Sequence, residues 1–283
     1  MILKILGSAG PGGFPQWNCA CPNCHGARSG ALQAKRRTQS QLAFSPLENV
    51  WFLIGASPDL RAQILATRDL APTADAPSPI AGLFLPSADL EMVEGLLQLI
   101  EMGSSFMFAT PAVQRVLKTE NRLLLCSSGP GAQAHWQPLS PRRRIGCHLS
   151  ENPGDAPTFF YTAVPFGGNY PDYASEEMRR SCPAEEARLG FVLEQGDKKL
   201  FLAPRSVGGS AEWLKAAESA DVSLLDSALW EELLLQFPNG SKGRRILTHI
   251  PHESPLLDEK SDEHRSVVEA GFEIAYDGME MRL

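Results

Sequence analysis

The sequence predicts an α/β (α+β) fold in which sheets are flanked by helices. Apolar strand-like runs alternate with amphipathic helical segments towards both ends of the chain. The middle instead favours hairpins, with turn residues between short apolar runs. No linker is long enough to divide the chain. These three observations indicate one domain over residues 1–283, built as layers of sheet and helix.

The N-terminal elements follow from two signals. The run 49–57 is almost continuously apolar, which is typical of a strand covered on both faces. Pro58 then stands near the first position of a helical pattern. By the same reasoning strands are expected at residues 2–6, 38–44, 80–86 and 105–110, and helices at 58–67, 90–102 and 111–120.

The middle of the chain, roughly residues 119–183, is richer in Pro and Gly and predicts only one clear strand, at 159–166. A hairpin follows at 189–204, turning at 195–197. The remaining expected elements are helices at 210–220, 227–237 and 262–271, and strands at 222–226, 244–250 and 272–278, the last being the final strand.

Composition excludes two classes of function. The net charge of −7 argues against a nucleic-acid binder, because phosphate contacts need a basic surface. The arginines at 142–144 are the only strong basic cluster, and we interpret them as a solvated loop. No run of about 18 apolar residues predicts a membrane span. The short apolar segment at the N-terminus is not a secretory signal, so we expect a cytoplasmic protein.

The stretch GFPQWNCACPNCHGA, residues 13–27, carries Cys19, Cys21 and Cys24. In a reducing compartment, closely spaced cysteines indicate a metal site more often than a disulfide framework. A structural zinc needs four ligands, often Cys3His. His25 directly follows Cys24 and would strain the site, so His252, in a turn stiffened by a proline, is the better fourth ligand.

Four protein ligands would leave no open position, so such a zinc would stabilise the fold and not catalyse. The alternative is that these thiols are reduced and unligated. The other cysteines, Cys126, Cys147 and Cys182, are far apart in sequence and are interpreted as buried or incidental thiols.

Several stretches carry a specific resemblance. LGSAGPGGFPQWNCACPNC, RRTQS, ASPDLRAQI, PLLDE and AYDGMEMRL closely resemble the B-protein family of pyrroloquinoline quinone (PQQ) biosynthesis, in the metallo-β-lactamase superfamily. The resemblance implies an αββα four-layer sandwich, two mixed sheets face to face with helices outside. In related phosphodiesterases a similar Cys triplet and a C-terminal His hold a structural zinc. That set matches Cys19, Cys21, Cys24 and His252, and would clasp loop 13–27 to the C-terminal part.

The family is linked to PQQ formation in two ways. Its members are described as iron-dependent oxygenases acting on a tyrosine-containing precursor, or as carriers of PQQ to the periplasm. The resemblance therefore implies a small-molecule partner, PQQ or its precursor, or a peptide. It implies neither nucleic acid nor membrane as a partner, and it is compatible with a homodimer.

This sequence differs from the family pattern at the catalytic metal site. The superfamily builds that site from H-x-H-x-D-H at the end of a strand. Aligned on the following Gly-Leu-Leu, this chain reads SADLEM at 87–92, so that the Asp corresponds to Glu91 and the final His to Met92. The family has further histidines in the middle of its sequence, and the corresponding stretch here, NYPDY at 169–173, has none. A family segment with a Gly-His pair before residue 244 is also missing. Asp226 and His249 remain, and Asp59 matches the Asp that orients the site from behind the ligands.

Two interpretations of these remnants follow. An altered site of Asp89 or Glu91, Asp226 and His249 could hold Fe(II), although the usual facial triad has two histidines. In the interpretation we favour, the site has lost its metal, because losing most imidazoles lowers metal affinity. Asp226 and His249 would then be hydrogen-bonded to each other or to water.

Two further classes stay open. A binding or scaffold protein could keep the fold and recognise a peptide or a quinone. A hydrolase is disfavoured, because zinc needs the lost histidines to generate hydroxide near neutral pH. The glycines of GSAGPGG are interpreted as a turn, since no Lys-Ser/Thr pair follows them.

Overall fold

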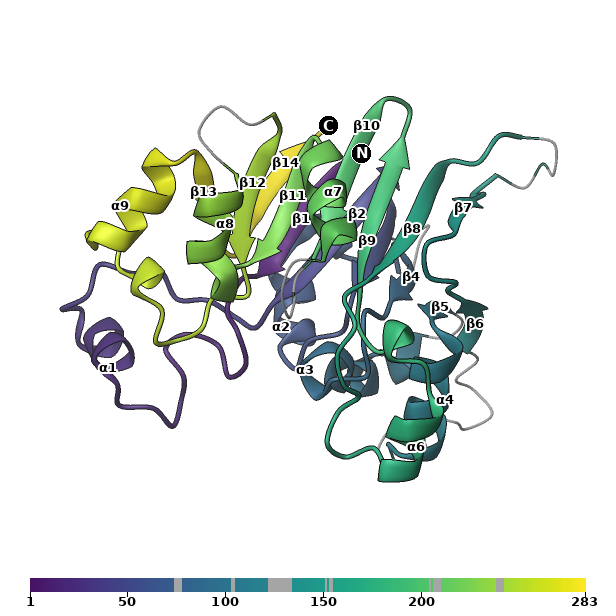
Figure 1. Cartoon of the computed structure of the whole chain (residues 1–283), viewed down its shortest axis with the longest axis horizontal. Coiled ribbons are helices and arrows are strands. Elements are labelled where there is room, and N and C mark those ends of the chain that lie inside the picture. The colour runs from purple at the N-terminus through teal and green to yellow at the C-terminus, as the bar shows by residue number, and fades with distance from the viewer. Residues whose placement is uncertain are drawn as a thin grey trace.

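Two seven-stranded sheets form the centre of the protein (Figure 1). The computed structural model describes residues 1–73, 78–102, 105–121, 134–150, 152, 155–203, 205, 210–237 and 242–283. The first sheet has the order β14 (Met279–Arg282), β1 (Ile2–Gly7), β2 (Gln41–Leu47), β3 (Val50–Ile54), β4 (Ile80–Phe84), β5 (Ser105–Ala109), β6 (Ala134–Pro138). The second has the order β13 (Phe272–Ile274), β12 (Arg244–Thr248), β11 (Val222–Asp226), β10 (Lys198–Leu202), β9 (Leu189–Gln195), β8 (Phe159–Pro165), β7 (Arg144–Cys147).

Both sheets are mixed. Strands β3 to β6 are parallel, as are β10 to β13, and the remaining pairs are antiparallel. The inner faces share an apolar core that is dense in aromatic rings. In it Phe84 stacks on Phe108 with 4.3 Å between ring centroids, and Phe44 meets Phe159 edge-on. Such ring geometries add to the free energy gained from burial.

Helices cover the outer faces. On the first sheet lie α2 (Leu60–Ala66), α3 (Leu90–Val93), α4 (Pro111–Thr119) and α6 (Glu176–Ser181), and on the second lie α7 (Ala211–Ser219), α8 (Trp230–Gln236) and α9 (Asp262–Glu269). A separate apolar cluster includes Cys24, Ile250 and Leu257 beside α1 (Pro22–Ser29). The αββα sandwich expected from the resemblance is confirmed.

Some sequence-based expectations were wrong at the ends of elements. The strand at 272–278 ends at Ile274, and the chain turns at Gly278 and adds a final strand, β14, beside β1. The strand expected at 38–44 begins only at Gln41, because the amides of Thr38 and Gln39 donate to carboxylates of Asp277 and Asp59. Strands β6 and β7 and helix α6 were missed in the irregular middle.

The helix expected at 90–102 consists of the short helix α3 and a 3₁₀ helix from Glu94 to Met102. Gly95 is required there, because a Cβ atom at this position would lie 2.2 Å from the carbonyl oxygen of Ser57. The close approach lets the amide of Gly95 donate to the carbonyl oxygen of Ala56.

The arginines at 142–144 are exposed, as expected, but two of them are paired. Arg142 contacts Glu185 and Glu212, and Arg144 lies 2.7 Å from Glu194. Their charge is therefore partly balanced within the chain. Among the described residues, no helix is both long and apolar enough to cross a membrane.

The aromatic core predicts a strong dependence of stability on Phe84. Phe84→Ala should lower the free energy of unfolding by about 3–5 kcal/mol, because a fully buried ring is removed. Phe106→Ala, on the neighbouring strand but 46% exposed, should cost less than about 1 kcal/mol. Urea denaturation of the two variants measures the difference, and equal losses would contradict the described core.

Candidate functional site

The Cys loop leaves the sandwich and returns to it near the C-terminal third, so that α1 lies apart from the sheets (Figure 1). Its position is fixed by a short bridge between Ala9 and Ile250. In this bridge the amide of Gly10 donates to the carbonyl oxygen of Ile250, and the amide of Ile250 donates to that of Ser8. The end of the first strand therefore lies beside the end of the strand expected at 244–250.

Four side chains converge beside this bridge. The ligand atoms of Cys19, Cys21, Cys24 and His252 all lie within 4.8 Å of one another, and they are the one such group in the described ranges. His252 Nδ1 is 3.6 Å from the sulfur atoms of both Cys19 and Cys21. Zn–S and Zn–N bonds of ordinary length at a tetrahedral angle place S and N about 3.6 Å apart. The donor set therefore fits a tetrahedral metal ion.

Backbone amides hold the sulfur atoms in place. The amides of Gln16, Cys21 and Cys24 lie 3.3–3.5 Å from the sulfur atoms of Cys24, Cys19 and Cys21 respectively. Cys21 also caps the N-terminus of α1. Arg28 donates to backbone carbonyl groups of the loop. The hydrogen bonds favour negative sulfur without neutralising it.

The thiols do not share this negative charge equally. Burial raises the pKa of Cys21. Hydrogen bonds with the amide of Cys24 and the ring of His252 lower it by a larger amount, so that the pKa is about 7. Burial, together with the neighbouring sulfur atoms, raises the pKa of Cys24 to about 11, although the Gln16 amide opposes this. A bound metal ion would release the proton of Cys24 and balance the charge of the thiolates that bind it.

Contacts from α1 tie the loop to the C-terminal segment. The side-chain amide of Asn23 donates to the carbonyl oxygens of His252 and Ser254, at 3.3 and 3.0 Å. Cys24 is fully buried against the apolar cluster that includes Ile250. The geometry is that of a clasp between the two ends of the chain.

A second group of charged side chains lies where the two sheets meet. Asp89 and Glu91 follow β4, Asp226 ends β11, and His249 follows β12. All four are buried or nearly so, with side chains between 3% and 11% exposed. The structure thus brings the four remnant residues together.

His249 lies between two carboxylates. Its Nε2 is 3.1 Å from Glu91 Oε2, and its Nδ1 is 3.4 Å from Asp226 Oδ2. Asp226 and His249 are therefore in contact, but the 3.4 Å separation is longer than that of the expected hydrogen bond. The backbone of His249 has φ of 55°, which is strained for a residue other than glycine and is typical of functional positions.

Two arginines that the sequence analysis did not single out complete the group. Arg188 contacts both carboxylate oxygens of Asp89, at 3.1 and 3.3 Å. Arg205 lies 3.0 Å from Asp89 and also contacts Glu91. Arg188 is placed by a bridge to Ser87, which no local sequence signal could have indicated.

Met92, at the position aligned with a family histidine, does not face this charged group. Its side chain is 2% exposed and belongs to the apolar cluster under the helices of the first sheet, with Leu60 and Val93. Its carbonyl oxygen accepts a hydrogen bond from the amide of Ala56. Met92 acts as a core residue.

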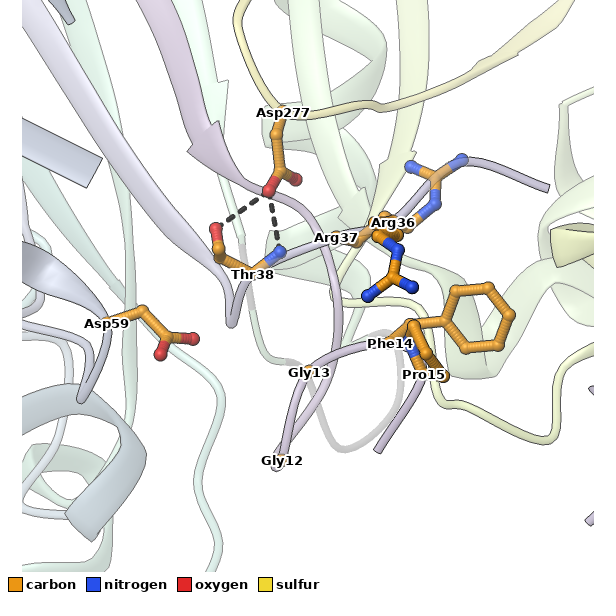
Figure 2. Close-up of a pocket in the computed structure, with 9 residues that line it drawn as sticks. All are labelled: Gly12, Gly13, Phe14, Pro15, Arg36, Arg37, Thr38, Asp59 and Asp277. Atoms are coloured by element: carbon orange, nitrogen blue, oxygen red, sulfur yellow. Dashed lines mark hydrogen bonds between the residues drawn. The ribbon is translucent and has the colours of Figure 1, made fainter. Parts of the chain in front are cut away.

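Asp59 comes between β3 and α2 and lies at the rim of a pocket. Its carboxylate accepts a hydrogen bond of 2.9 Å from the amide of Gln39. It lines a pocket of about 320 Å³, opposite Phe14 and Pro15 (Figure 2). The other lining residues are Gly12, Gly13, Arg36, Arg37, Thr38 and Asp277. In the same view Asp277 binds the amide and hydroxyl of Thr38.

The remaining cysteines match a structural interpretation. Cys182 is buried and contacts the sulfur of Met178, and Cys147 is partly buried, which raises its pKa to about 11. Cys126 lies outside the described residues.

Comparison with known proteins gives concordant matches. The beta-lactamase superfamily domain matches residues 50–268. The coenzyme PQQ synthesis protein B of Azotobacter vinelandii is 33% identical over 311 residues, covering all of both chains. The crystal structure of Zn²⁺-bound PqqB from Methylobacterium extorquens superposes with a TM-score of 0.81 at 28% identity, again over both whole chains. A diphosphatase of the PhnP family shares the fold, with a TM-score of 0.67 at 17% identity over 100% of this chain and 97% of the other.

The charged group predicts a pH dependence of stability. Burial lowers the pKa of His249, but Asp226 and Glu91 raise it more, from 6.5 to about 9. Folding therefore tightens proton binding, so the stabilisation is complete below about pH 6.5 and is lost as the pH rises through 9. Between pH 6 and 9.5, wild-type stability should fall by on the order of 2 kcal/mol more than that of His249→Gln.

Urea denaturation at the two pH values measures this difference. The exposed His148→Gln is the matched control and should follow the wild type. Equal pH slopes for wild type and His249→Gln would show that the imidazole carries no extra proton in the folded state.

Proposed function

The chain belongs to the family of coenzyme PQQ synthesis protein B within the beta-lactamase superfamily, and on this premise we propose that it acts in PQQ synthesis without a catalytic metal. In this proposal it binds PQQ or a precursor, for formation or transport, as one domain in the cytoplasm. A structural zinc at Cys19, Cys21, Cys24 and His252 stabilises it. The observation that carries the proposal is the contrast between two donor sets.

The Cys3His donors converge on one point, and within the described part of the chain no lysine or arginine is hydrogen-bonded to their sulfur atoms. Such a set is stable when a metal ion occupies it, and zinc suits thiolate and imidazole ligands. The carboxylates at the end of the sandwich are instead contacted by arginine and histidine side chains. The imidazole of His249 uses its two nitrogen atoms on two different carboxylates, which is the arrangement of a bridge and not of a chelate.

The relatives support a loss of segments as well. The alignment to the A. vinelandii protein spans 311 positions, against the 283 residues of this chain, so that protein carries stretches without a counterpart here.

The alternative is an oxygenase that hydroxylates a tyrosine-containing precursor through Fe(II) held by Asp89 or Glu91, Asp226 and His249. Fe(II) would have to displace the side-chain contacts just described. The alternative is therefore distinguished by metal content.

Elemental analysis of the purified protein tests the proposal. We expect one zinc per chain, lost in Cys19→Ser because the tetrahedral set is broken, and retained in His249→Ala. Cys147→Ser, which lies outside the cluster, is the matched control and should keep its zinc. The absence of zinc would reject the Cys3His assignment, and iron lost in His249→Ala would favour the oxygenase.

The pocket of Figure 2 is the proposed place for the ligand. The carboxylate of Asp277 is engaged by Ser8 and Thr38, and that of Asp59 by Gln39. Arg36 is exposed beside them. PQQ carries carboxylates, which a guanidinium group binds well.

Arg36→Ala should therefore weaken PQQ binding at least fivefold in isothermal titration calorimetry, since one charge-assisted contact is lost. Arg61→Ala, an exposed change on α2 outside the pocket, is the control and should bind as the wild type does. Unchanged affinity in Arg36→Ala would place the ligand elsewhere.

A further inference from the structure

The charged side chains at the end of the sandwich form a chain of alternating sign. Taken by contact, its order is Arg188, Asp89, Arg205, Glu91, His249, Asp226. Two members follow β4 of the first sheet. The other four belong to the second sheet, where they lie before β9, after β10, at the end of β11 and after β12. Three carboxylates thus meet three groups that can carry positive charge.

One atom has a special place in this chain. Arg205 Nη1 lies 3.0 Å from Asp89 Oδ2 and also contacts Glu91 Oε1. A single nitrogen atom of the protein is therefore shared by two carboxylates from the strand end at which the superfamily resemblance places metal ligands. The position corresponds to that of a bridging cation.

The neighbours of Arg205 keep these carboxylates in place. Arg188 holds Asp89 through both oxygens, and Ser87 donates to the same carboxylate at 2.9 Å. His249 holds the other oxygen of Glu91. Because both acids are at most 11% exposed, removing Arg205 would leave buried negative charge without its shared partner.

We propose that Arg205 is the built-in cation of this site, and that neutralising it turns the site into one that binds a divalent cation through Asp89 and Glu91. The inference rests on the proposed function, in which the wild-type chain holds no metal here. Carboxylate oxygens are the ligands that hard divalent ions such as Mn²⁺ prefer. Without the charge of Arg205, the carboxylates of Asp89 and Glu91 would offer two such oxygen atoms to one ion.

Mn²⁺ is the probe, measured by its EPR signal in titrations of the zinc-loaded protein. Arg205→Met should bind Mn²⁺ at least tenfold more tightly than the wild type. Arg205→Lys keeps the charge and should behave as the wild type does. Arg205→Met combined with Glu91→Gln should lose the gain. Arg180→Met, which removes an exposed arginine paired with Glu176, is the matched control and should change nothing.

Thermal melting by circular dichroism confirms that each variant folds, and Arg205→Gln replaces Arg205→Met if the latter does not. Wild-type protein that binds Mn²⁺ as tightly as Arg205→Met, with loss in Glu91→Gln, would overturn both this inference and the metal-free site. No gain in Arg205→Met or Arg205→Gln would overturn this inference alone, because a wild type with one zinc per chain still agrees with the proposed function.

Discussion

Buried negative charge must be balanced, and this constraint decides the character of both charged groups in the protein. The two groups are neighbours, since His249 and His252 lie in one short loop after β12. At the Cys loop the sulfur atoms meet backbone amides and an imidazole. At the end of the sandwich the carboxylates meet two guanidinium groups and an imidazolium. In the function proposed above, a metal ion balances the charge only at the Cys loop.

The fold explains why both groups lie at this place. The bridge between Ala9 and Ile250 brings the end of β1 to the end of β12, which sets the Cys loop beside the C-terminal segment. The bridge between Ser87, after β4, and Arg188, before β9, likewise joins the two sheets. Residues distant in sequence therefore meet where strands of both sheets end. The family's metal chemistry and this chain's ion pairs depend on the same scaffold.

Sequence reasoning worked where the signal was local. Apolar runs located the central strands, and the spacing of Cys19, Cys21 and Cys24 indicated a shared ligand set with His252. It failed where contacts are long-range. Arg205 meets Glu91 across 114 positions of chain only because β10 and β4 lie in facing sheets. The edge strand β14 was overlooked because its four residues alternate buried and exposed side chains over too short a run.

The resemblance to the family predicted the sandwich, yet it did not predict the side chains that contact Asp89 and Glu91. Met92 illustrates the point: it aligns with a family histidine, while its side chain packs under the helices as part of the core. The packing around Met92, which the sequence does not state, decides its role.

The central claim is that a metal ion holds the clasp while Arg205 takes the cation's place at the sandwich end. Anomalous X-ray scattering from crystals of the purified protein, grown with zinc and manganese, tests it most directly. The account predicts one anomalous peak, surrounded by Cys19, Cys21, Cys24 and His252, and a guanidinium group between Asp89 and Glu91. A second anomalous peak between those two carboxylates, with Arg205 displaced, would contradict it.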